Sequence, residues 1–239
     1  MSTFFISDLH LDESRPHVTR AFFSWLQQHA VQAQALYILG DFFEAWVGDD
    51  NSTELIRDVI AALKQQTNNG TPIYLMHGNR DFTIGQKFCE QTGCQLINDP
   101  SVINLYGKPI LLMHGDNLCT EDVQYLKLRA QIRNPAWQQE QLSKPLHERL
   151  AMAKYLREAS AEAKSNKAEN IMDVTASEVK HVMQENQTKL LIHGHTHRPK
   201  IHSMEDGNTR IVLGDWDQQG WYLHVHSNGS YDLNHFVIN

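Results

Sequence analysis

The chain has 239 residues, 41% of them hydrophobic and 21% charged, and a net charge of −7 at pH 7. This composition is typical of an ordinary globular protein with one large domain, or one domain carrying a substantial insertion. The acidic balance argues against a general nucleic-acid binder, which carries a basic excess. No apolar run approaches the ~18 residues of a membrane span.

The cysteines and the N-terminal segment favour a cytoplasmic protein. Cys89, Cys94 and Cys119 have neither the spacing of a disulfide framework nor that of a thiolate zinc site, so we expect buried, inert thiols in a reducing compartment. The first segment, 3–7, is strand-like and lacks the basic leader and apolar core of a signal peptide.

Strand-like runs alternate with helical patterns in the first half of the chain. One helical face follows the first strand and carries four apolar residues, Val18, Phe22, Trp25 and Leu26. A second helical face follows the next strand and carries Leu55, Val59 and Leu63. Asn51 and Glu54 have the spacing of an N-terminal capping pair for that second helix. Thr92-Gly93 is typical of a helix end, and 106–109 is typical of a turn between two strands.

No strand-like runs occur between residues 117 and 170. This stretch is polar, favours helices and contains Pro135 and Pro145. We call 117–170 the cap insertion and expect it to be helical and to cover the active site. The core would then consist of 1–116 and 171–239. Residues 175–178 form a capping box that opens another helix. Four further strands are predicted at 189–192, 209–213, 221–226 and 233–238.

Five short apolar runs each lead into metal-type ligands. The runs are 4–6, 36–39, 73–76, 110–113 and 190–192. Such runs are typical of buried strands, and ligands of open α/β sheets gather beyond the carboxyl ends of those strands. Seven side chains are therefore expected to converge: Asp8, His10, Asp41, Asn79, His114, His195 and His197.

Carboxylate, amide and imidazole ligands without thiolate suit Mn²⁺, Fe, Zn²⁺ or Mg²⁺. Seven ligands exceed what one open catalytic ion needs but suit two ions that share a carboxylate. Asp41 is the best bridge because it sits midway in the set, directly after Gly40, which allows close backbone approach. We expect His77, His193 and the remaining histidines to be structural or to support the metal ligands from behind.

The ligands stand in motifs that resemble the calcineurin-like metallophosphoesterase signature. These motifs are 8–10, 40–44, 78–81, 114–116 and 194–197. The resemblance implies a four-layer α/β/β/α sandwich with a dinuclear metal site. It assigns one ion to Asp8, His10, Asp41 and His197. It assigns the other to Asp41, Asn79, His114 and His195.

Arg80 departs from the wider superfamily, many members of which have a histidine there that is credited with protonating the leaving group. Arginine stays protonated because its pKa exceeds ~12, but it can clamp a phosphate with two hydrogen bonds. A phosphate leaving group needs little protonation, so Arg80 favours a diphosphate substrate over an alkyl ester.

The cap insertion points toward an anionic substrate. It contains nine Lys or Arg and seven Asp or Glu, in a chain of net charge −7. One helical face carries Arg157, Ser160, Lys164 and Lys167, at i, i+3, i+7 and i+10. A solvated helix face has the same pattern, but here the pattern lies in an insertion to a phosphoesterase core.

A narrower resemblance covers nearly the whole chain, to the UDP-2,3-diacylglucosamine pyrophosphohydrolases of bacterial lipid A synthesis. The matching stretches are 36–50, 77–82, 114–120, 171–174 and 191–199. The resemblance implies Mn²⁺-dependent hydrolysis to UMP and 2,3-diacylglucosamine 1-phosphate, with metal-activated water attacking the α-phosphorus. The catalytic residues would be Asp41, Asn79, Arg80, His114 and His195. The substrate contacts would be Asn79, Arg80, Asp122, Ser160, Lys164, Lys167 and His195, with Tyr125 and Arg157 added from neighbouring cap positions.

The family also implies peripheral contact with the cytoplasmic face of the inner membrane, where a lipid substrate resides, with no nucleic-acid or protein partner. In this chain the 135–145 stretch is polar, so we expect attachment that salt can reverse. Two acyl chains still require an apolar groove. Its candidate lining residues, which helix packing explains equally well, are Leu126, Leu128, Ile132, Leu146, Leu150, Met152 and Leu156.

Two other functions compete with this interpretation. A phosphoesterase of soluble diphosphates, such as nucleotide sugars or dinucleotide polyphosphates, would share the same core and differ only in the cap insertion. A non-catalytic binding module on this fold should have lost ligands, whereas all seven are present. A nuclease is disfavoured by the acidic charge and the lack of a long basic stripe.

Overall fold

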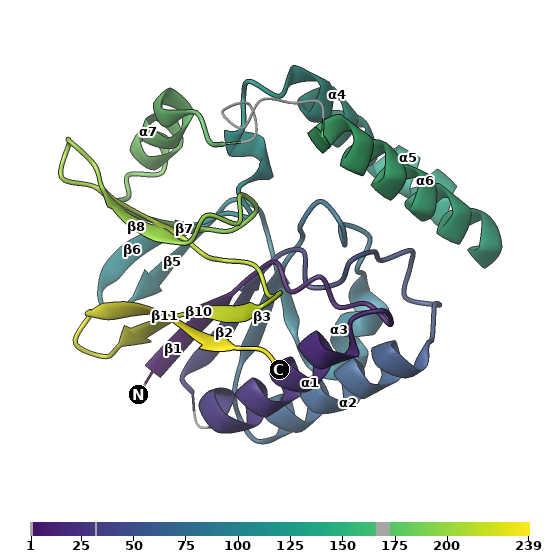
Figure 1. Ribbon diagram of the computed structural model, residues 1–239. Coiled ribbons are helices and arrows are strands. Elements are labelled where there is room, and N and C mark those ends of the chain that lie inside the picture. Colours follow the sequence, from purple (N-terminus) through teal and green to yellow (C-terminus); the bar gives the residue numbers. More distant parts are fainter. Residues whose placement is uncertain (1, 32, 166–172) are drawn as a thin grey trace.

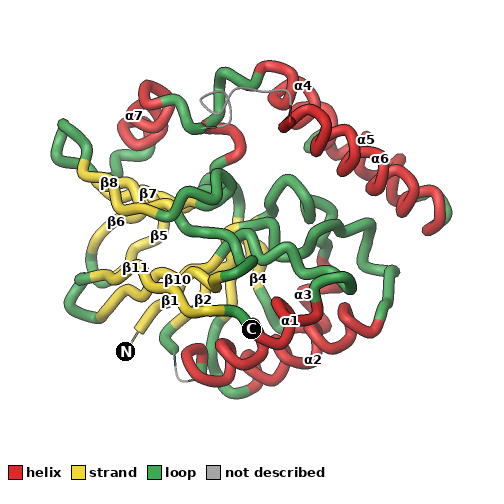
Figure 2. The backbone as a smooth tube through the Cα atoms, viewed as in Figure 1, coloured by secondary structure: helices red, strands yellow, loops and turns green. Residues whose placement is uncertain are grey.

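The protein folds into two stacked sheets with helices on both outer faces, as the computed structural model shows (Figures 1 and 2). The structure describes residues 2–31, 33–165 and 173–239, with residues 160–165 described by their backbone only. Both ends of the chain lie near the first sheet (Figure 1). The predicted four-layer α/β/β/α sandwich is confirmed.

The first sheet has six strands, in the order β11-β10-β1-β2-β3-β4. Their bounds are β1 Ser2–Ile6, β2 Ala35–Leu39, β3 Ile73–Met76, β4 Gln95–Ile97, β10 Gln219–His226 and β11 Tyr231–Val237. β1 to β4 are parallel, and β10 and β11 extend the sheet as an antiparallel edge. The carboxyl ends of β1, β2 and β3 therefore meet at one edge.

The second sheet has five strands, in the order β5-β6-β7-β9-β8. Their bounds are β5 Ser101–Leu105, β6 Lys108–Leu112, β7 Leu190–His193, β8 Lys200–Ser203 and β9 Thr209–Val212. β6, β7 and β9 are parallel, and β5 and β8 are antiparallel edges. All five runs that precede the predicted ligands are thus strands.

Alternate residues of the central strands face different apolar cores. Phe5 of β1 packs between the sheets with Leu39, Leu112 and Ile192. Its neighbours on β1 face the helices on the other side of the first sheet. A third core lies between the second sheet and a single helix, with Leu191 and Met183 among its members. Burial of both faces explains why these strands are continuously apolar.

Helices α1 (Pro16–Trp25), α2 (Glu54–Asn68) and α3 (Gln86–Thr92) cover the first sheet, and α1 continues as a π-helical turn, Leu26–Ala30. Helix α7 (Ala176–Glu185) covers the second sheet. The expected apolar face of α1 is buried, as are Val59 and Leu63 of α2. None of the described helices combines the length and apolarity needed to cross a bilayer.

One capping prediction is wrong: the N-cap of α2 is Thr53, whose side chain accepts a hydrogen bond from Ile56 N, so Asn51 lies outside the helix. The other is right about the helix start, since Thr175 is the N-cap of α7, but its side chain makes no capping bond and accepts a hydrogen bond from Thr120 instead. The predicted helix end holds: Gly93 ends α3 in the left-handed conformation. The short edge strands β4 and β8 were not expected.

The described part of the cap insertion is helical and forms a group beside the two sheets (Figure 1). A 3-10 turn, Asp116–Leu118, leads into it, followed by α4 (Val123–Ile132), α5 (Pro135–Leu142) and α6 (Leu146–Ser165). The division into core and cap at residues 117 and 170 stays a prediction.

Three arginines tie the cap insertion to the core. Arg129 Nε donates to buried Asp116 Oδ2 at 2.8 Å, and Arg133 Nη2 donates to Gly78 O at 2.8 Å. Arg149 Nη1 donates to Val47 O at 2.6 Å, and its guanidinium pairs with Asp50. Part of the positive charge that we interpreted as substrate-binding therefore anchors these helices.

Candidate metal centre

The structure brings all seven predicted ligands together at the carboxyl edge of the two sheets. Asp8 and His10 follow β1, Asp41 follows β2, and Asn79 follows β3. The three remaining ligands come from the second sheet, with His114 after β6 and His195 and His197 after β7. Neighbouring loops are joined by backbone hydrogen bonds, among them Asp8 N to Gly40 O at 3.0 Å and Gly194 N to His114 O at 2.9 Å.

The first cluster consists of Asp8, His10 and His197, with one ligand atom from each within 4.8 Å of the others. Nε2 of His10 lies 3.4 Å from Nε2 of His197. Oδ1 of Asp8 lies 3.5 Å from the same His197 nitrogen. Asp8 is fully buried, so its carboxylate is fixed among protein atoms.

The second cluster consists of Asp41, His114 and His195, whose ligand atoms also lie within 4.8 Å of one another. Asn79 joins it, since its Oδ1 lies 3.0 Å from His114 Nε2 and 2.9 Å from His195 Nδ1. Asp41 lies between the clusters. Its Oδ2 is 3.8 Å from His10 Nε2, and its Oδ1 is 3.7 Å from His114 Nε2.

These residues fit a pair of divalent ions. Two ligands of one ion with bonds of about 2.1 Å lie roughly 3.0–3.4 Å apart, close to the spacing between His10 and His197. Oδ1 of Asp8 is buried and has no hydrogen-bond partner in the part of the chain that the structure describes. Asp41 offers one oxygen toward each cluster, as a shared carboxylate requires.

The ligands hold an unusual backbone conformation. Among the described residues, seven residues other than glycine have positive φ, and five of them are predicted ligands. These five are Asp8, His10, Asp41, His195 and His197, with φ between 49° and 67°. A residue other than glycine in this region costs on the order of 1–3 kcal/mol, and such residues concentrate at functional sites. The strain turns each side chain sharply inward where its strand ends.

Glycines let the ligand loops approach backbone to backbone. A Cβ on Gly40 would lie 2.6 Å from Gly78 Cα, and a Cβ on Gly78 would lie 2.1 Å from Asp41 Oδ1. Gly40 also has φ +88°. Side chains at either position would push the loops after β2 and β3 apart, as the sequence predicted for Gly40.

Asp81 holds the same two loops together. The residue is fully buried. Its Oδ2 accepts hydrogen bonds from Phe42 N at 2.8 Å and Phe43 N at 3.4 Å, and its Oδ1 accepts one from Gly78 N at 2.8 Å. Sequence reasoning quoted Asp81 inside a motif but gave it no role, although an acid next to a ligand loop was a usable signal.

Partners on the outer ring nitrogens orient the histidines. Nδ1 of His114 donates to Leu39 O at 2.8 Å, which leaves Nε2 facing the centre. Nδ1 of His10 lies 2.9 Å from Glu44 Oε2. His197 Nδ1 lies 3.5 Å from Asp215. Such partners fix the ring tautomer and raise metal affinity. Glu44 stood in a quoted motif without a role, and Asp215 gave no sequence signal.

The charges of the clusters shift the pKa values of their members. Burial lowers the pKa of His114, but Asp41, Asp8 and Asp116 outweigh it and raise this pKa to about 9. Burial raises the pKa of Asp8, but the nearby His197, with the charges of His114 and His10, outweighs it and holds this pKa below its usual range. Imidazole must be neutral to bind metal, so loading the centre releases protons.

The predicted substrate-binding residues surround the centre unevenly. Arg80 Nη1 lies 3.8 Å from Glu44 Oε1, and its backbone N donates to Asp41 at 2.8 Å. Arg157 of α6 lies 3.8 Å from Asp12, in the loop after β1. The side chains of Ser160 and Lys164 and the whole of Lys167 lie outside the described parts of the chain.

Tyr125 and Asp122 lie at the start of α4. The Tyr125 hydroxyl donates to Asp116 Oδ2, while its ring stacks on that of His195 with centroids 6.2 Å apart. The ring of Tyr125, and not its hydroxyl, therefore contacts the metal centre. Asp122 caps α4 by accepting a hydrogen bond from Tyr125 N.

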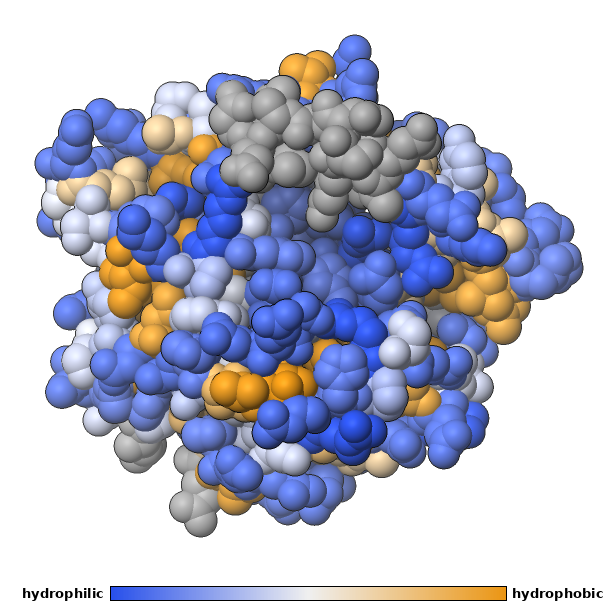
Figure 3. Space-filling model, viewed as in Figure 1, coloured by the Kyte–Doolittle hydropathy of each residue, from blue (hydrophilic) through white to orange (hydrophobic). Residues whose placement is uncertain are grey.

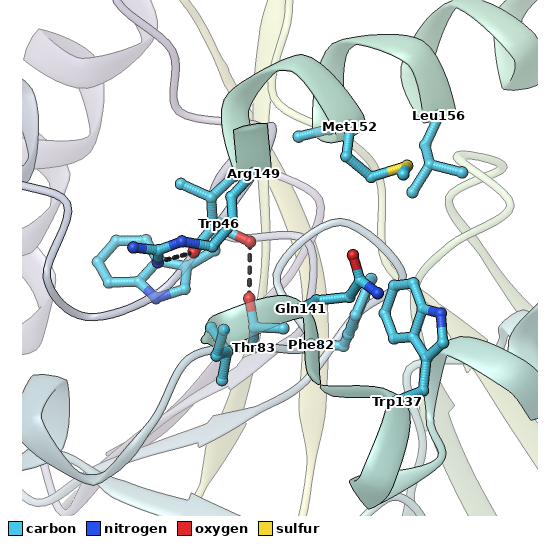
Figure 4. A pocket seen from close by; sticks show the side chains of 11 residues that line it. Trp46, Phe82, Thr83, Trp137, Gln141, Arg149, Met152 and Leu156 are labelled. Atoms are coloured by element: carbon cyan, nitrogen blue, oxygen red, sulfur yellow. Dashed lines mark hydrogen bonds between the residues drawn. The ribbon is translucent and has the colours of Figure 1, made fainter. Parts of the chain in front are cut away.

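A small, mostly apolar pocket of about 60 Å³ lies between the core and the cap insertion (Figure 4). Trp46 and Phe82 come from core loops, Trp137 from α5, and Met152 and Leu156 from α6. Of the groove residues expected from sequence, Met152 and Leu156 line this pocket. Ile132 is instead buried, and Leu128 and Leu150 are exposed.

The predicted thiols are buried and form no disulfide. Burial raises the pKa of Cys94 and that of Cys119 to about 12, which keeps both thiols protonated and unreactive.

Comparison with known proteins shows which family the chain belongs to. Residues 1–199 match the family model described as calcineurin-like phosphoesterase. The chain belongs to the calcineurin-like phosphoesterase family. A curated relative from Marinobacter nauticus, named UDP-2,3-diacylglucosamine hydrolase, is 53% identical, with 98% of each chain covered. One of the same name from Pseudomonas aeruginosa is 54% identical over 96% of this chain and 97% of its own.

Among solved structures, an archaeal phosphodiesterase matches with a TM-score of 0.53 at 12% identity, covering 99% of this chain and 100% of its own. This likeness shows the fold. Family membership and the paired His/Asp clusters together make the chain a metallophosphoesterase hydrolase with a dinuclear centre.

Replacing Asp81 tests whether its three backbone hydrogen bonds hold the ligand loops. Asp81→Ala should lower the free energy of unfolding by at least about 3 kcal/mol, since each buried N–H left without an acceptor costs about 1–3 kcal/mol. Asp81→Asn, which keeps one acceptor oxygen, should lose less. Urea titrations measure both, with exposed Asp206→Ala as the matched control. A loss from Asp81→Ala no larger than that of the control would contradict this role.

Replacing Glu44 tests whether it orients His10. Glu44→Ala should weaken metal binding about 10–100-fold, the usual effect of removing a partner of a metal-binding histidine. Calorimetric titration of metal-free protein with Mn²⁺ gives the affinity. Exposed Glu121→Ala is the control and should bind as the unmodified chain does. Unchanged affinity in Glu44→Ala would show that Glu44 does not act through His10.

Proposed function

We propose that the chain hydrolyses the pyrophosphate bond of UDP-2,3-diacylglucosamine, giving UMP and 2,3-diacylglucosamine 1-phosphate in lipid A biosynthesis. The observation that carries the proposal is 53% identity over 98% of both chains to a relative named for this hydrolysis. The seven convergent ligands and the apolar pocket beside them agree with a diphosphate substrate that carries acyl chains.

Asp8, His10, Asp41 and His197 would hold one divalent ion, and Asp41, Asn79, His114 and His195 the other, both most consistent with Mn²⁺. When bound, such a pair lowers the pKa of a water for attack on the α-phosphorus and neutralises phosphoryl charge. Asp41 is the shared ligand in this proposal because its two oxygens face different clusters.

Arg80 would bind the diphosphate. Its side chain is mostly buried and is held near Glu44, so its guanidinium is already placed before substrate arrives. Two N–H groups of a guanidinium match two phosphate oxygens, and the permanent charge offsets that of the leaving phosphate. Asn79 and His195 would contact the same phosphates from the second cluster.

The cap insertion, 117–170, would bind the rest of the substrate. Arg157, Ser160, Lys164 and Lys167 have the sequence spacing of one helical face and would contact anionic groups, together with Asp122 and Tyr125. The pocket between Trp46, Trp137 and Leu156 would hold part of an acyl chain. Its lining is mostly apolar, so burying each methylene there contributes about 0.8 kcal/mol.

The cap insertion would also contact the inner membrane from the cytoplasmic side. Six of the exposed large hydrophobic residues among the described residues belong to it: Val123, Leu128, Leu142, Leu150, Met152 and Tyr155. An orange patch lies at the right of Figure 3, below the position of α5 and α6 in Figure 1. These side chains would supply the apolar contacts of a peripheral attachment.

Loss of the shared ligand Asp41, or of His114 from the second cluster, tests the reaction. Asp41→Ala and His114→Ala should reduce hydrolysis of UDP-2,3-diacylglucosamine at least 1000-fold, by an estimate of roughly 4 kcal/mol or more of transition-state stabilisation. When the unmodified chain hydrolyses the substrate in ¹⁸O-labelled water, phosphorus NMR of the products should find the label in UMP. Label in the sugar phosphate instead would rule out attack at the α-phosphorus.

A charge in the apolar pocket tests the acyl site and separates the diacylated substrate from soluble diphosphates. Leu156→Asp should raise KM for UDP-2,3-diacylglucosamine about 10–100-fold, since one lost apolar contact of this size is worth about 1.5–3 kcal/mol. Lys154→Asp, on the exposed side of the same helix, is the matched control. Faster turnover of UDP-N-acetylglucosamine than of the diacylated sugar by the unmodified chain would favour the soluble-diphosphate alternative.

A further inference from the structure

A third group of metal-type side chains lies on the β10–β11 hairpin. His224 and His226 on β10 and Asp232 on β11 each offer one ligand atom, and these atoms lie within 4.8 Å of one another. His224 and His226 are two residues apart on a strand and share a face. Asp232 is the direct antiparallel partner of His224, so its side chain lies on that face too. Strand geometry therefore brings the three together.

His224 has a buried nitrogen available. Its Nε2 is buried and has no hydrogen-bond partner among the described residues. The ring stacks on Phe4 of β1, with centroids 4.7 Å apart and planes inclined by 24°, which fixes its orientation. Burial, then the neighbouring His226, lowers the pKa of His224, so the ring is in the neutral form that binds metal. A buried polar atom without a partner is costly, and a metal ion would satisfy it.

His226 and Asp232 provide the solvent-facing side of the group. Nε2 of His226 lies 2.7 Å from Asp232 Oδ2. Their side chains are 36% and 63% exposed, so an ion can reach them. The rings of His224 and His226 have centroids 3.9 Å apart, so the two imidazoles lie against each other.

We propose that His224, His226 and Asp232 form a third metal site that takes a borderline transition ion, Zn²⁺ foremost. Two imidazoles and one carboxylate are a donor set that Zn²⁺ accepts with water in the fourth position. Harder ions such as Mn²⁺ and Mg²⁺ prefer sites richer in oxygen. The chemistry therefore separates this site from the dinuclear centre, which has more oxygen ligands.

The site also lies apart from that centre. His226 pairs with Ser2 at the start of β1, whereas Asp8 follows the end of the same strand. Six residues of extended chain span roughly 20 Å, so no ion can be shared. A bound ion would instead join β10 to β11, the edge strand of the first sheet. The expected effect is to slow the local opening of this hairpin.

Zinc stoichiometry tests the site. The full chain and three variants are dialysed to equilibrium against Zn²⁺, and bound zinc is counted by plasma mass spectrometry. His226→Ala and Asp232→Asn should each bind one zinc fewer per chain than the unmodified protein. His181→Ala, which removes an exposed histidine on α7, should bind the same number as the unmodified protein.

Hydrogen exchange gives a second readout. Zn²⁺ should slow amide exchange in β11 of the unmodified chain and of His181→Ala, but not in His226→Ala. Equal zinc binding by all four proteins, or an equal loss in His181→Ala, would overturn the proposal. Retained Mn²⁺-dependent hydrolysis in the variants shows that they fold, and the zinc difference is measured independently of which phosphoester the centre cleaves.

Discussion

The centre depends on the contact between the loops that follow β2 and β3, where Gly40 and Gly78 meet backbone to backbone. No side chain fits between them, because an added Cβ would approach other atoms to within 2.6 Å at Gly40 and 2.1 Å at Gly78. The buried carboxylate of Asp81 then bonds to backbone N–H groups of both loops. This contact sets where Asp41 and Asn79 lie, and through them where the two clusters meet.

The packing of the two sheets stabilises the strained backbone of the metal ligands. Five ligands with positive φ and several buried carboxylates are unfavourable on their own. They persist because the strands that carry them are buried on both faces, between one core shared by the sheets and an outer core on each side. Metal ions would offset the remaining repulsion among the carboxylates, so the centre and its ligand ions stabilise each other.

Local patterns predicted the elements that position the site. Continuous apolar runs ending in Asp, Asn or His were enough to place the ligands at one sheet edge, since a parallel strand can only deliver its next residues there. Short edge strands such as β8 were missed because four residues, none of them buried, carry little pattern. The N-cap of α2 moved from Asn51 to Thr53 because several polar residues there can cap equally well.

Interactions between distant segments could not be predicted. Arg129, Arg133 and Arg149 add to the positive charge of the cap insertion that we interpreted as favouring an anionic substrate, but they anchor the cap insertion through partners 13 to 102 residues away. The function of a cation depends on which carboxylate or carbonyl the fold brings beside it. The same reason hid the group at His224, which sequence reasoning treated as structural, because Asp232 reaches it only through strand pairing.

The central claim is that Asp41 is shared by two metal ions held at the rim of the sheets. Anomalous diffraction from crystals grown with Mn²⁺ tests it most directly. The account predicts two manganese peaks about 3.5–4 Å apart, as in other two-metal sites, with one oxygen of Asp41 facing each cluster or one oxygen between the ions. A single peak, or two peaks that Asp41 does not contact, would contradict the account.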